Sequence, residues 1–200
     1  MVIIPAWSKM MFMVTGLTMV VVTCIFSVQA AAVTDTNEVS DLYDKGATLL
    51  EEGKYQDAII YFDKILAMDP NDIDALLKKG ISLSGLAKFD EAISYYDKGL
   101  NINASYTPLL FNKAVSLDEL GKHEEAITYY DKFLAIYPND TDVIFNKGLS
   151  FEELEKYKEA ISYYDEVLAI EPNYTKALDH KNSIISQLGN GSTTSGNVTG

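Results

Sequence analysis

The chain of 200 residues contains no arginine, one cysteine and two histidines. Without arginine it lacks the planar guanidinium group that suits bidentate capture of phosphate or carboxylate ligands. Its acidic residues outnumber its lysines by 29 to 16, and the formal net charge is -13. Affinity for nucleic acid comes mainly from cations that neutralise phosphates. The composition therefore argues against a nucleic-acid partner.

The scarcity of cysteine and histidine limits the chemistry further. Cys24 lies in an apolar N-terminal stretch, so the rest of the chain has neither a disulfide framework nor a thiolate metal cluster. A metal site needs more ligands than the two scattered histidines, His123 and His180, and some surface carboxylates. The convergent titratable cluster typical of an active site is also missing. We therefore expect no enzyme, no catalytic residue, no metal and no cofactor.

An uncharged run covers residues 10–28, with Lys9 before it and small residues up to Ala30 after it. This order is typical of a secretory signal peptide, with cleavage after Ala30. The run is also close to the roughly 20 residues that span a bilayer, so an uncleaved membrane anchor is the alternative. We predict a signal peptide or anchor over 1–30 and a linker over 31–38. Either a signal peptide or an anchor places the remainder of the chain outside the cytoplasm, secreted or at the cell surface. Membrane contact is expected only through residues 10–28, and only if they are not cleaved off.

A short box with two aromatic residues and an aspartate recurs along the chain. "ISYYD" occurs at Ile93–Asp97 and Ile161–Asp165, "ITYYD" lies midway, and "IIYFD" precedes them at Ile59–Asp63. The spacing is 34 residues, and repeats of this length indicate an array of like units. The units are 39–72, 73–106, 107–140 and 141–174; the last two are identical at nineteen of thirty-four positions.

Each unit has the apolar spacing of two amphipathic helices. The first helix carries a central small residue, and the second an alanine followed four positions later by an aromatic residue. These landmarks are Gly46, Gly80, Ala114 and Gly148; Ala58, Ala92, Ala126 and Ala160; and Phe62, Tyr96, Tyr130 and Tyr164. Proline follows three of the second helices. We expect the second aromatic of each box in the core, the first at its edge with a wet hydroxyl, and the aspartate in solvent.

In length and in these landmarks, residues 39–174 resemble the tetratricopeptide repeat. The resemblance implies an all-α fold, a right-handed α-solenoid of antiparallel helix pairs. Residues 175–188 are predicted to form a capping helix with one polar face, which ends a domain over 39–188. Residues 189–200 are predicted to be a flexible tail rich in glycine, serine, threonine and asparagine.

The resemblance also implies a concave groove, lined by the first helices, in which extended peptides or partner helices bind. Its predicted residues are Tyr43, Ala47, Leu77, Ile81, Phe111, Val115, Phe145 and Leu149. An acidic rim borders them, formed by Glu51, Asp118, Glu119, Glu152 and Glu153. Aromatic anchors inside a charged rim suit a protein-binding hot spot. The alternative is that these side chains only pack one first helix against the next.

The sequence thus predicts a non-catalytic, exported scaffold that binds a protein or peptide, and the acidic rim favours a basic or apolar segment. The family's lysine-and-asparagine clamp for a C-terminal carboxylate is not met, since Tyr43 and Ala47 stand at its first two positions. Two other functions stay open. The exposed tyrosines suit a carbohydrate-binding cell-envelope module, and the array suits end-to-end self-assembly.

Two further patterns have simple interpretations. Lysines and aspartates recur at the period, at Lys45, Lys79, Lys113 and Lys147 and at Asp63, Asp97, Asp131 and Asp165. They are interpreted as a solvated helix face with weak ion pairs, worth about 0–1 kcal/mol each, rather than as a charge stripe for a ligand. His123 replaces an aromatic residue at a helix junction, and His180 belongs to the cap. Asn190 and Asn197 are candidate glycosylation acceptors in the tail.

Overall fold

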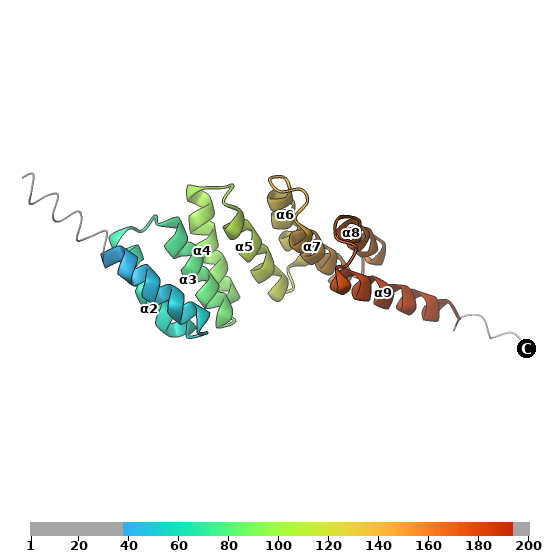
Figure 1. Ribbon diagram of the computed structural model, residues 1–200, viewed down its shortest axis with the longest axis horizontal. Helices are drawn as coiled ribbons and strands as arrows, with labels where there is room; N and C mark the ends of the chain where they lie inside the picture. Colours follow the sequence, from blue (N-terminus) through green and yellow to red (C-terminus); the bar gives the residue numbers. More distant parts are fainter. Residues whose placement is uncertain (1–37, 194–200) are drawn as a thin grey trace, which may run out of the picture.

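The computed structural model describes residues 38–193, and over this range every regular element is an α-helix. A helix over 38–51 comes first. Eight more follow it: α2 (Tyr55–Met68), α3 (Ile73–Gly85), α4 (Phe89–Ile102), α5 (Thr107–Glu119), α6 (His123–Leu134), α7 (Thr141–Glu153), α8 (Tyr157–Ile170) and α9 (Thr175–Thr193). Each helix packs against the next along the chain, and the pairs follow one another in a row (Figure 1). The predicted all-α solenoid is confirmed.

The last helix extends further than predicted. α9 ends at Thr193 rather than at residue 188, so its end includes the glycine that was expected to begin the tail. A glycine costs about 1 kcal/mol relative to alanine inside a helix, which by itself does not end one. The predicted signal peptide or anchor, most of the linker, residues 194–200 and the side chain of Asn190 lie outside the described part.

The core of every unit is built from the predicted alanine and aromatic residue of its second helix. The four alanines and the aromatics Phe62, Tyr96, Tyr130 and Tyr164 are at most 1% exposed. The small residue of the first helix makes room for them: a Cβ atom on Gly148 would lie 2.7 Å from the ring of Tyr164. Real Cβ contacts are not this short, so glycine allows the close approach of the two helices.

The turn inside each unit requires a left-handed residue. Gly53 and Gly121 occupy this position with φ of 72°, as glycine does readily. Ala87 and Glu155 hold the same position in the other two units with φ of 57° and 56°. A residue with a Cβ atom is strained in this region by roughly 1–2 kcal/mol.

Replacing Ala87 by glycine is therefore expected to stabilise the protein. The relief of strain exceeds the entropy that glycine loses on folding, and we expect a gain of about 0.5–1 kcal/mol in the free energy of unfolding. Urea denaturation measures it. Ala169→Gly, at an exposed helical position of α8, should instead lower stability by up to about 1 kcal/mol. Equal effects of the two substitutions would contradict the assignment of strain to the turn.

Three of the four periodic lysines, all except Lys45, are not on a solvated face, which corrects the interpretation from the sequence. Lys113 and Lys147 are 6% and 8% exposed. The ammonium group of Lys113 donates to Asp97 on the preceding unit and to the Tyr129 hydroxyl, 2.7 Å away, on its own unit. The expected ion pairs do form, but across unit boundaries and with the lysine stem buried.

The same arrangement recurs along the array. It joins Lys79 to Asp63 and Tyr95, Lys147 to Asp131 and the Tyr163 ring, and Lys181 to Asp165. Burial lowers the pKa of Lys113, but its hydrogen bonds to Asp97 and Tyr129 outweigh this, so the pKa is raised. The lysine thus stays charged, and each one links two units.

Lys113→Met tests this link because it keeps the apolar stem and removes the charge. We expect a loss of about 1–2 kcal/mol in unfolding free energy, as for a charge-assisted hydrogen bond lost at a partly buried site. Lys45→Met is the matched control: Lys45 holds the same repeat position in the first unit but is exposed. A change within about 0.5 kcal/mol is expected there. Equal losses in the two variants would show that the buried link is not stabilising.

Candidate partner-binding groove

The predicted groove residues form a half-buried surface on the first helices. Tyr43, Leu77 and Phe111 are half-buried, and so are the four residues one turn later. Phe145 differs, since it is only 6% exposed. Its ring packs against Tyr164, Tyr174 and His180, with centroids 5.3–5.6 Å away. Phe145 therefore belongs mainly to the core, because α9 covers it, and offers little surface to a partner.

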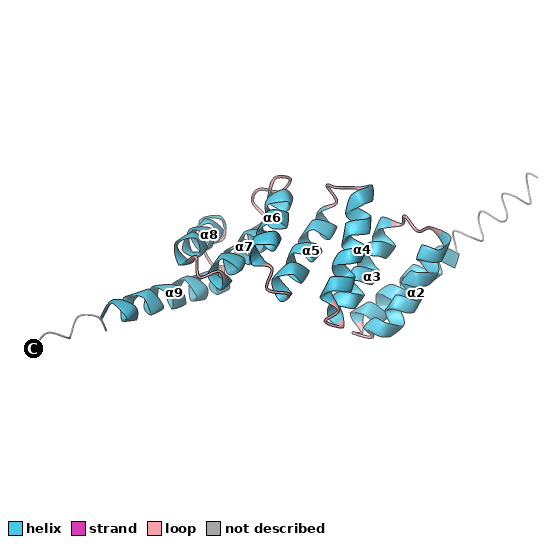
Figure 2. Cartoon of the chain, turned by 180° about the vertical axis from the view of Figure 1, so that it is seen from behind, coloured by secondary structure: helices cyan, strands magenta, loops and turns pink. Residues whose placement is uncertain are grey.

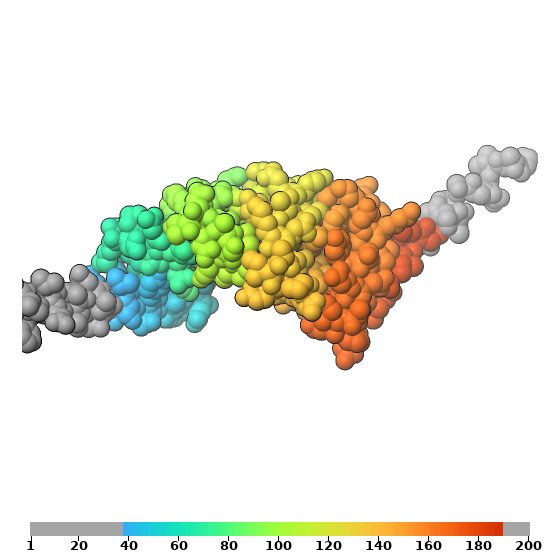
Figure 3. All heavy atoms as spheres, turned by 90° about the horizontal axis from the view of Figure 1, so that it is seen from above, coloured from blue at the N-terminus to red at the C-terminus, as the bar shows by residue number. Residues whose placement is uncertain are grey.

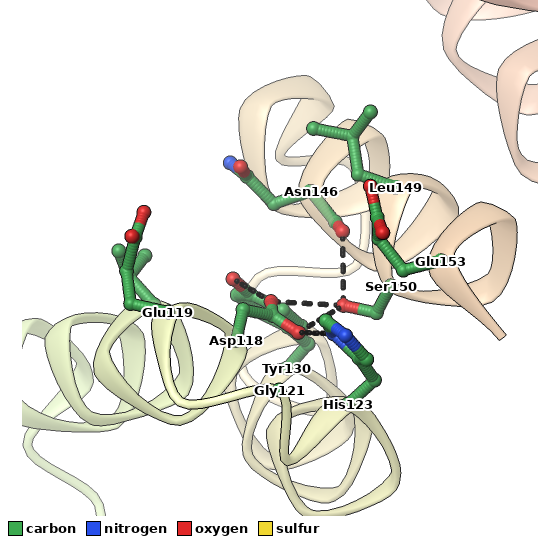
Figure 4. Close-up of a pocket in the computed structure, with 10 residues that line it drawn as sticks. Asp118, Glu119, Gly121, His123, Tyr130, Asn146, Leu149, Ser150 and Glu153 are labelled. Atoms are coloured by element: carbon green, nitrogen blue, oxygen red, sulfur yellow. Dashed lines mark hydrogen bonds and ion pairs between the residues drawn. The ribbon is translucent and has the colours of Figure 1, made fainter.

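A cavity of about 450 Å³ lies between the third and fourth units, within the predicted groove. Val115 and Leu149 provide apolar walls, and Asp118, Glu119 and Glu153 provide carboxylates. Asn146, Ser150, Tyr130, His123 and Gly121 complete its lining (Figure 4). Three of the five predicted rim acids are thus brought together with two of the predicted groove residues. Glu51 and Glu152 do not line this cavity.

Asp118 is held in place by three hydrogen-bonding neighbours. The Tyr130 hydroxyl donates to its Oδ2 at 2.9 Å, the Ser150 hydroxyl donates to both carboxylate oxygens at 2.9 Å, and His123 Nδ1 lies 2.9 Å from Oδ1. These contacts converge on one carboxylate in Figure 4. Asp118 is therefore a fixed negative charge, positioned by α5, α6 and α7 together.

The buried tyrosine beneath this carboxylate acts only as a donor. Burial raises the pKa of Tyr130, and the neighbouring charge of Asp118 raises it further. The same holds for Tyr164 in the fourth unit, where burial and the hydrogen bond to Glu152 raise the pKa. Both phenols are thus protonated wherever the protein is folded near neutral pH.

Residues at the position of Asp118 make the unit boundaries different from one another. In the second unit Ser84 takes the place of the acid and hydrogen-bonds to Ser116, with Oγ atoms 2.9 Å apart. In the fourth unit Glu152 accepts from Tyr164 at 2.5 Å, and His180 Nδ1 lies 2.9 Å from the same carboxylate. The boundary between the second and third units is neutral at this position, whereas the side chains of Asp118 and Glu152 at the next two boundaries are each 22% exposed. The acidic cavity lies at the boundary between the third and fourth units.

Both histidines have roles that sequence reasoning missed. His123 does occupy the junction position of an aromatic residue, but it also contacts Asp118. His180 lies over Glu152 and Phe145 rather than serving only the cap. The repeat period contained part of this information: His180 is 34 residues after Asn146, which lines the cavity, so it falls on the same face of its helix. Nothing in the period indicates which acid it contacts.

The first tyrosines of the repeated boxes have their rings occupied. Ammonium groups of Lys79 and Lys98 lie 4.2 and 4.3 Å from the ring centroid of Tyr95. Two lysines are placed in the same way around Tyr129. A sugar ring would have to displace these cations in order to stack. Sugar stacking on Tyr95 and Tyr129 is therefore disfavoured.

Metal binding and membrane insertion are two other possibilities for residues 38–193. Between residues 38 and 193, no group of three or more histidine, cysteine, aspartate or glutamate residues is placed to hold a metal ion. None of the helices in this part of the chain is long and apolar enough to cross a membrane.

Comparisons with known families and proteins agree with this architecture. A family model described as tetratricopeptide repeat matches residues 142–174, and one described as anaphase-promoting complex, cyclosome, subunit 3 matches residues 51–133. A comparison with curated proteins found no match.

Several solved structures have the same fold at low sequence identity. MamA 41-end from Desulfovibrio magneticus RS-1 is 18% identical, with a TM-score of 0.72, over 79% of this chain and 89% of that chain. Another MamA structure is 20% identical, with a TM-score of 0.69, over 76% of this chain and 83% of that chain. A tetratricopeptide repeat protein from Parabacteroides merdae ATCC 43184 is 20% identical, with a TM-score of 0.64 and coverages of 76% and 68%.

The raised pKa of Tyr130 predicts loss of stability at alkaline pH. Because its pKa is raised on folding, Tyr130 holds its proton more tightly in the folded protein than in the unfolded chain, where the pKa is near 10. The stabilisation that this difference gives is complete below pH 10 and is lost as the pH rises above it. Tyr130→Phe should flatten the decline of unfolding free energy above pH 10 by about 1.4 kcal/mol per pH unit. Urea denaturation between pH 8 and 11 measures the slope. Phe62 shows that phenylalanine fits this repeat position, and parallel slopes would refute the prediction.

Proposed function

Because the chain is a tetratricopeptide-repeat protein, we propose that it is an exported, non-catalytic scaffold that binds a protein segment in its groove. The fold itself supports a protein-interaction role. The observation that supports a particular site is the cavity between the third and fourth units. It joins apolar walls to three carboxylates and has no lysine in its lining.

The cavity suits a basic side chain that is carried on an apolar segment. Glu119 and Glu153 are exposed and lie on α5 and α7, on either side of the fixed Asp118. A lysine or arginine of the partner would meet all three charges, while its stem and neighbours pack on Val115 and Leu149. Half-buried Phe111 extends the apolar surface along the same helix. The segment thus needs one cation and apolar residues near it.

Binding is tested with a fluorescently labelled peptide that has one lysine between leucines, and with a second peptide in which norleucine replaces the lysine. Fluorescence anisotropy should show tighter binding of the lysine peptide. The variant Glu119→Gln with Glu153→Gln should weaken its binding about 5- to 30-fold, from about 0.5–1 kcal/mol per charge. The norleucine peptide should be unaffected by the double variant.

A matched control removes two exposed acids elsewhere. Glu159→Gln with Glu166→Gln on α8 changes the net charge equally but lies outside the cavity lining. The control should keep the affinity of the lysine peptide within about twofold, because exposed charges outside the cavity lining are screened by salt. An equal loss in both variants would mean that only net charge attracts the peptide, and the proposed cavity site would then be wrong.

The export part of the proposal rests on the sequence of residues 1–30 alone. Intact-mass measurement of protein isolated from its own cells tests it. A mass that lacks residues 1–30 supports cleavage after Ala30 and secretion, and the full mass in a membrane fraction supports an anchor. The full mass in the cytosol would overturn export. The same spectrum reports glycans on the tail asparagines.

A further inference from the structure

α9 has the pattern of a first helix, and within residues 38–193 no second helix follows it. It continues the 34-residue register, so Leu178 occupies the position of Leu42, Leu76, Leu110 and Ile144. Those four residues are at most 9% exposed because the second helix of their own unit covers them. Leu178 is 43% exposed. Ile185 is 49% exposed, whereas Leu83 and Leu117 at its repeat position are 3% and 2% exposed.

The opposite face of α9 packs against the fourth unit. Ala177 and Ile184 are completely buried against the fourth unit, in the same cluster as Tyr164 and Val167. α9 is the last element of the array in both ribbon views, and its C-terminal half extends beyond α8 (Figure 2). Leu178, Ile185 and Leu188 therefore form an apolar stripe about 15 Å long on the outer side of a well-anchored helix. We call these three residues the end stripe.

The opposite end of the array does not complement the end stripe. The position that packs on the preceding unit is apolar and buried in Ala75, Leu109, Val143 and Ala177. In the first helix it is Asp41, which is exposed, and exposed Asp44, Lys45 and Thr48 lie on the same helix. Joining arrays head to tail would bury Asp41 against apolar side chains, and an unpaired buried carboxylate is costly. End-to-end stacking, an alternative that the sequence leaves open, is therefore disfavoured.

We infer that the end stripe is the interface of a two-fold dimer, in which the α9 helices of two copies pack antiparallel. Within each unit the helix that covers a first helix runs antiparallel to it, and a two-fold axis across α9 places the second copy in that direction. Each α9 then serves as the covering helix of the other. The same three side chains meet from both sides, so the apolar stripe is self-complementary.

Charge also favours this end of the molecule for self-association. The chain as a whole carries -13, and like charges oppose the approach of two copies. α9 has two lysines, Lys176 and Lys181, and one acid, Asp179, which gives it a net charge of +1. Two copies that meet through α9 therefore bring together ends of net charge +1, whereas the first helix, over 38–51, has four acids and one lysine and carries -3.

Sedimentation equilibrium tests the dimer with the mature protein, or with the full chain in density-matched detergent if residues 1–30 are retained. We expect a reversible association that stops at two chains. Ile185→Glu with Leu188→Glu should raise the dimer dissociation constant at least about tenfold, because each substitution enters a two-fold interface twice. Both side chains are exposed in the single chain, so helicity should stay unchanged, and so should the urea midpoint at protein concentrations well below the dissociation constant.

Ile60→Glu is the matched control, because Ile60 is 50% exposed on α2, far from the end stripe in the sequence. This variant should dimerise like the wild type. Three results would each overturn the inference: a monomer at all concentrations up to the high micromolar range, growth beyond two chains, or a dimer that survives the double substitution. The groove variants should leave dimerisation unchanged, which separates this interface from the proposed peptide site.

Discussion

A unit of two helices has more apolar surface than one helix pair can bury, so each unit depends on its neighbour. In this protein that dependence takes two forms. The apolar part is the contact of residues such as Leu109 and Val143 with the preceding unit. The polar part is the lysine that is held between an aspartate of one unit and a tyrosine of the next. Because both recur with the period, the array is stabilised by the same boundary contact several times over.

The repeated aromatic core creates a second requirement, which the units meet differently. A buried tyrosine needs a partner for its hydroxyl group. Tyr96 has serine as its partner, Tyr130 has Asp118 and Tyr164 has Glu152. The partner side chain lies at the edge of the groove, so the choice of partner also sets the charge there. An identical core can thus support boundaries with different binding properties, and the acidic cavity is one result.

The repeated core and the contacts that vary between units differ in how well the sequence predicts them. The positions of the helices and the burial of Phe62 and its equivalents follow from periodicity, since the core repeats at fixed offsets. The links from Lys113 to Asp97 and Tyr129 join residues 16 apart on different helices, and no helical offset reveals such a contact. The burial of Phe145 depended on His180 and Tyr174. Predicting it would have required α9 to be recognised as a fifth first helix rather than as a generic cap.

At the two ends of the described chain, one helix has no neighbouring unit to cover it, and the two ends differ in how they meet water. The first helix replaces the buried apolar residue by Asp41 and is compatible with water, whereas α9 keeps its leucine and isoleucine. A dimer through α9 would complete the second end with the same kind of helix contact that completes every unit. It would also place two grooves on one body. A partner with two basic segments would then bind both, and the effective concentration of the second site would raise its affinity without any new contact.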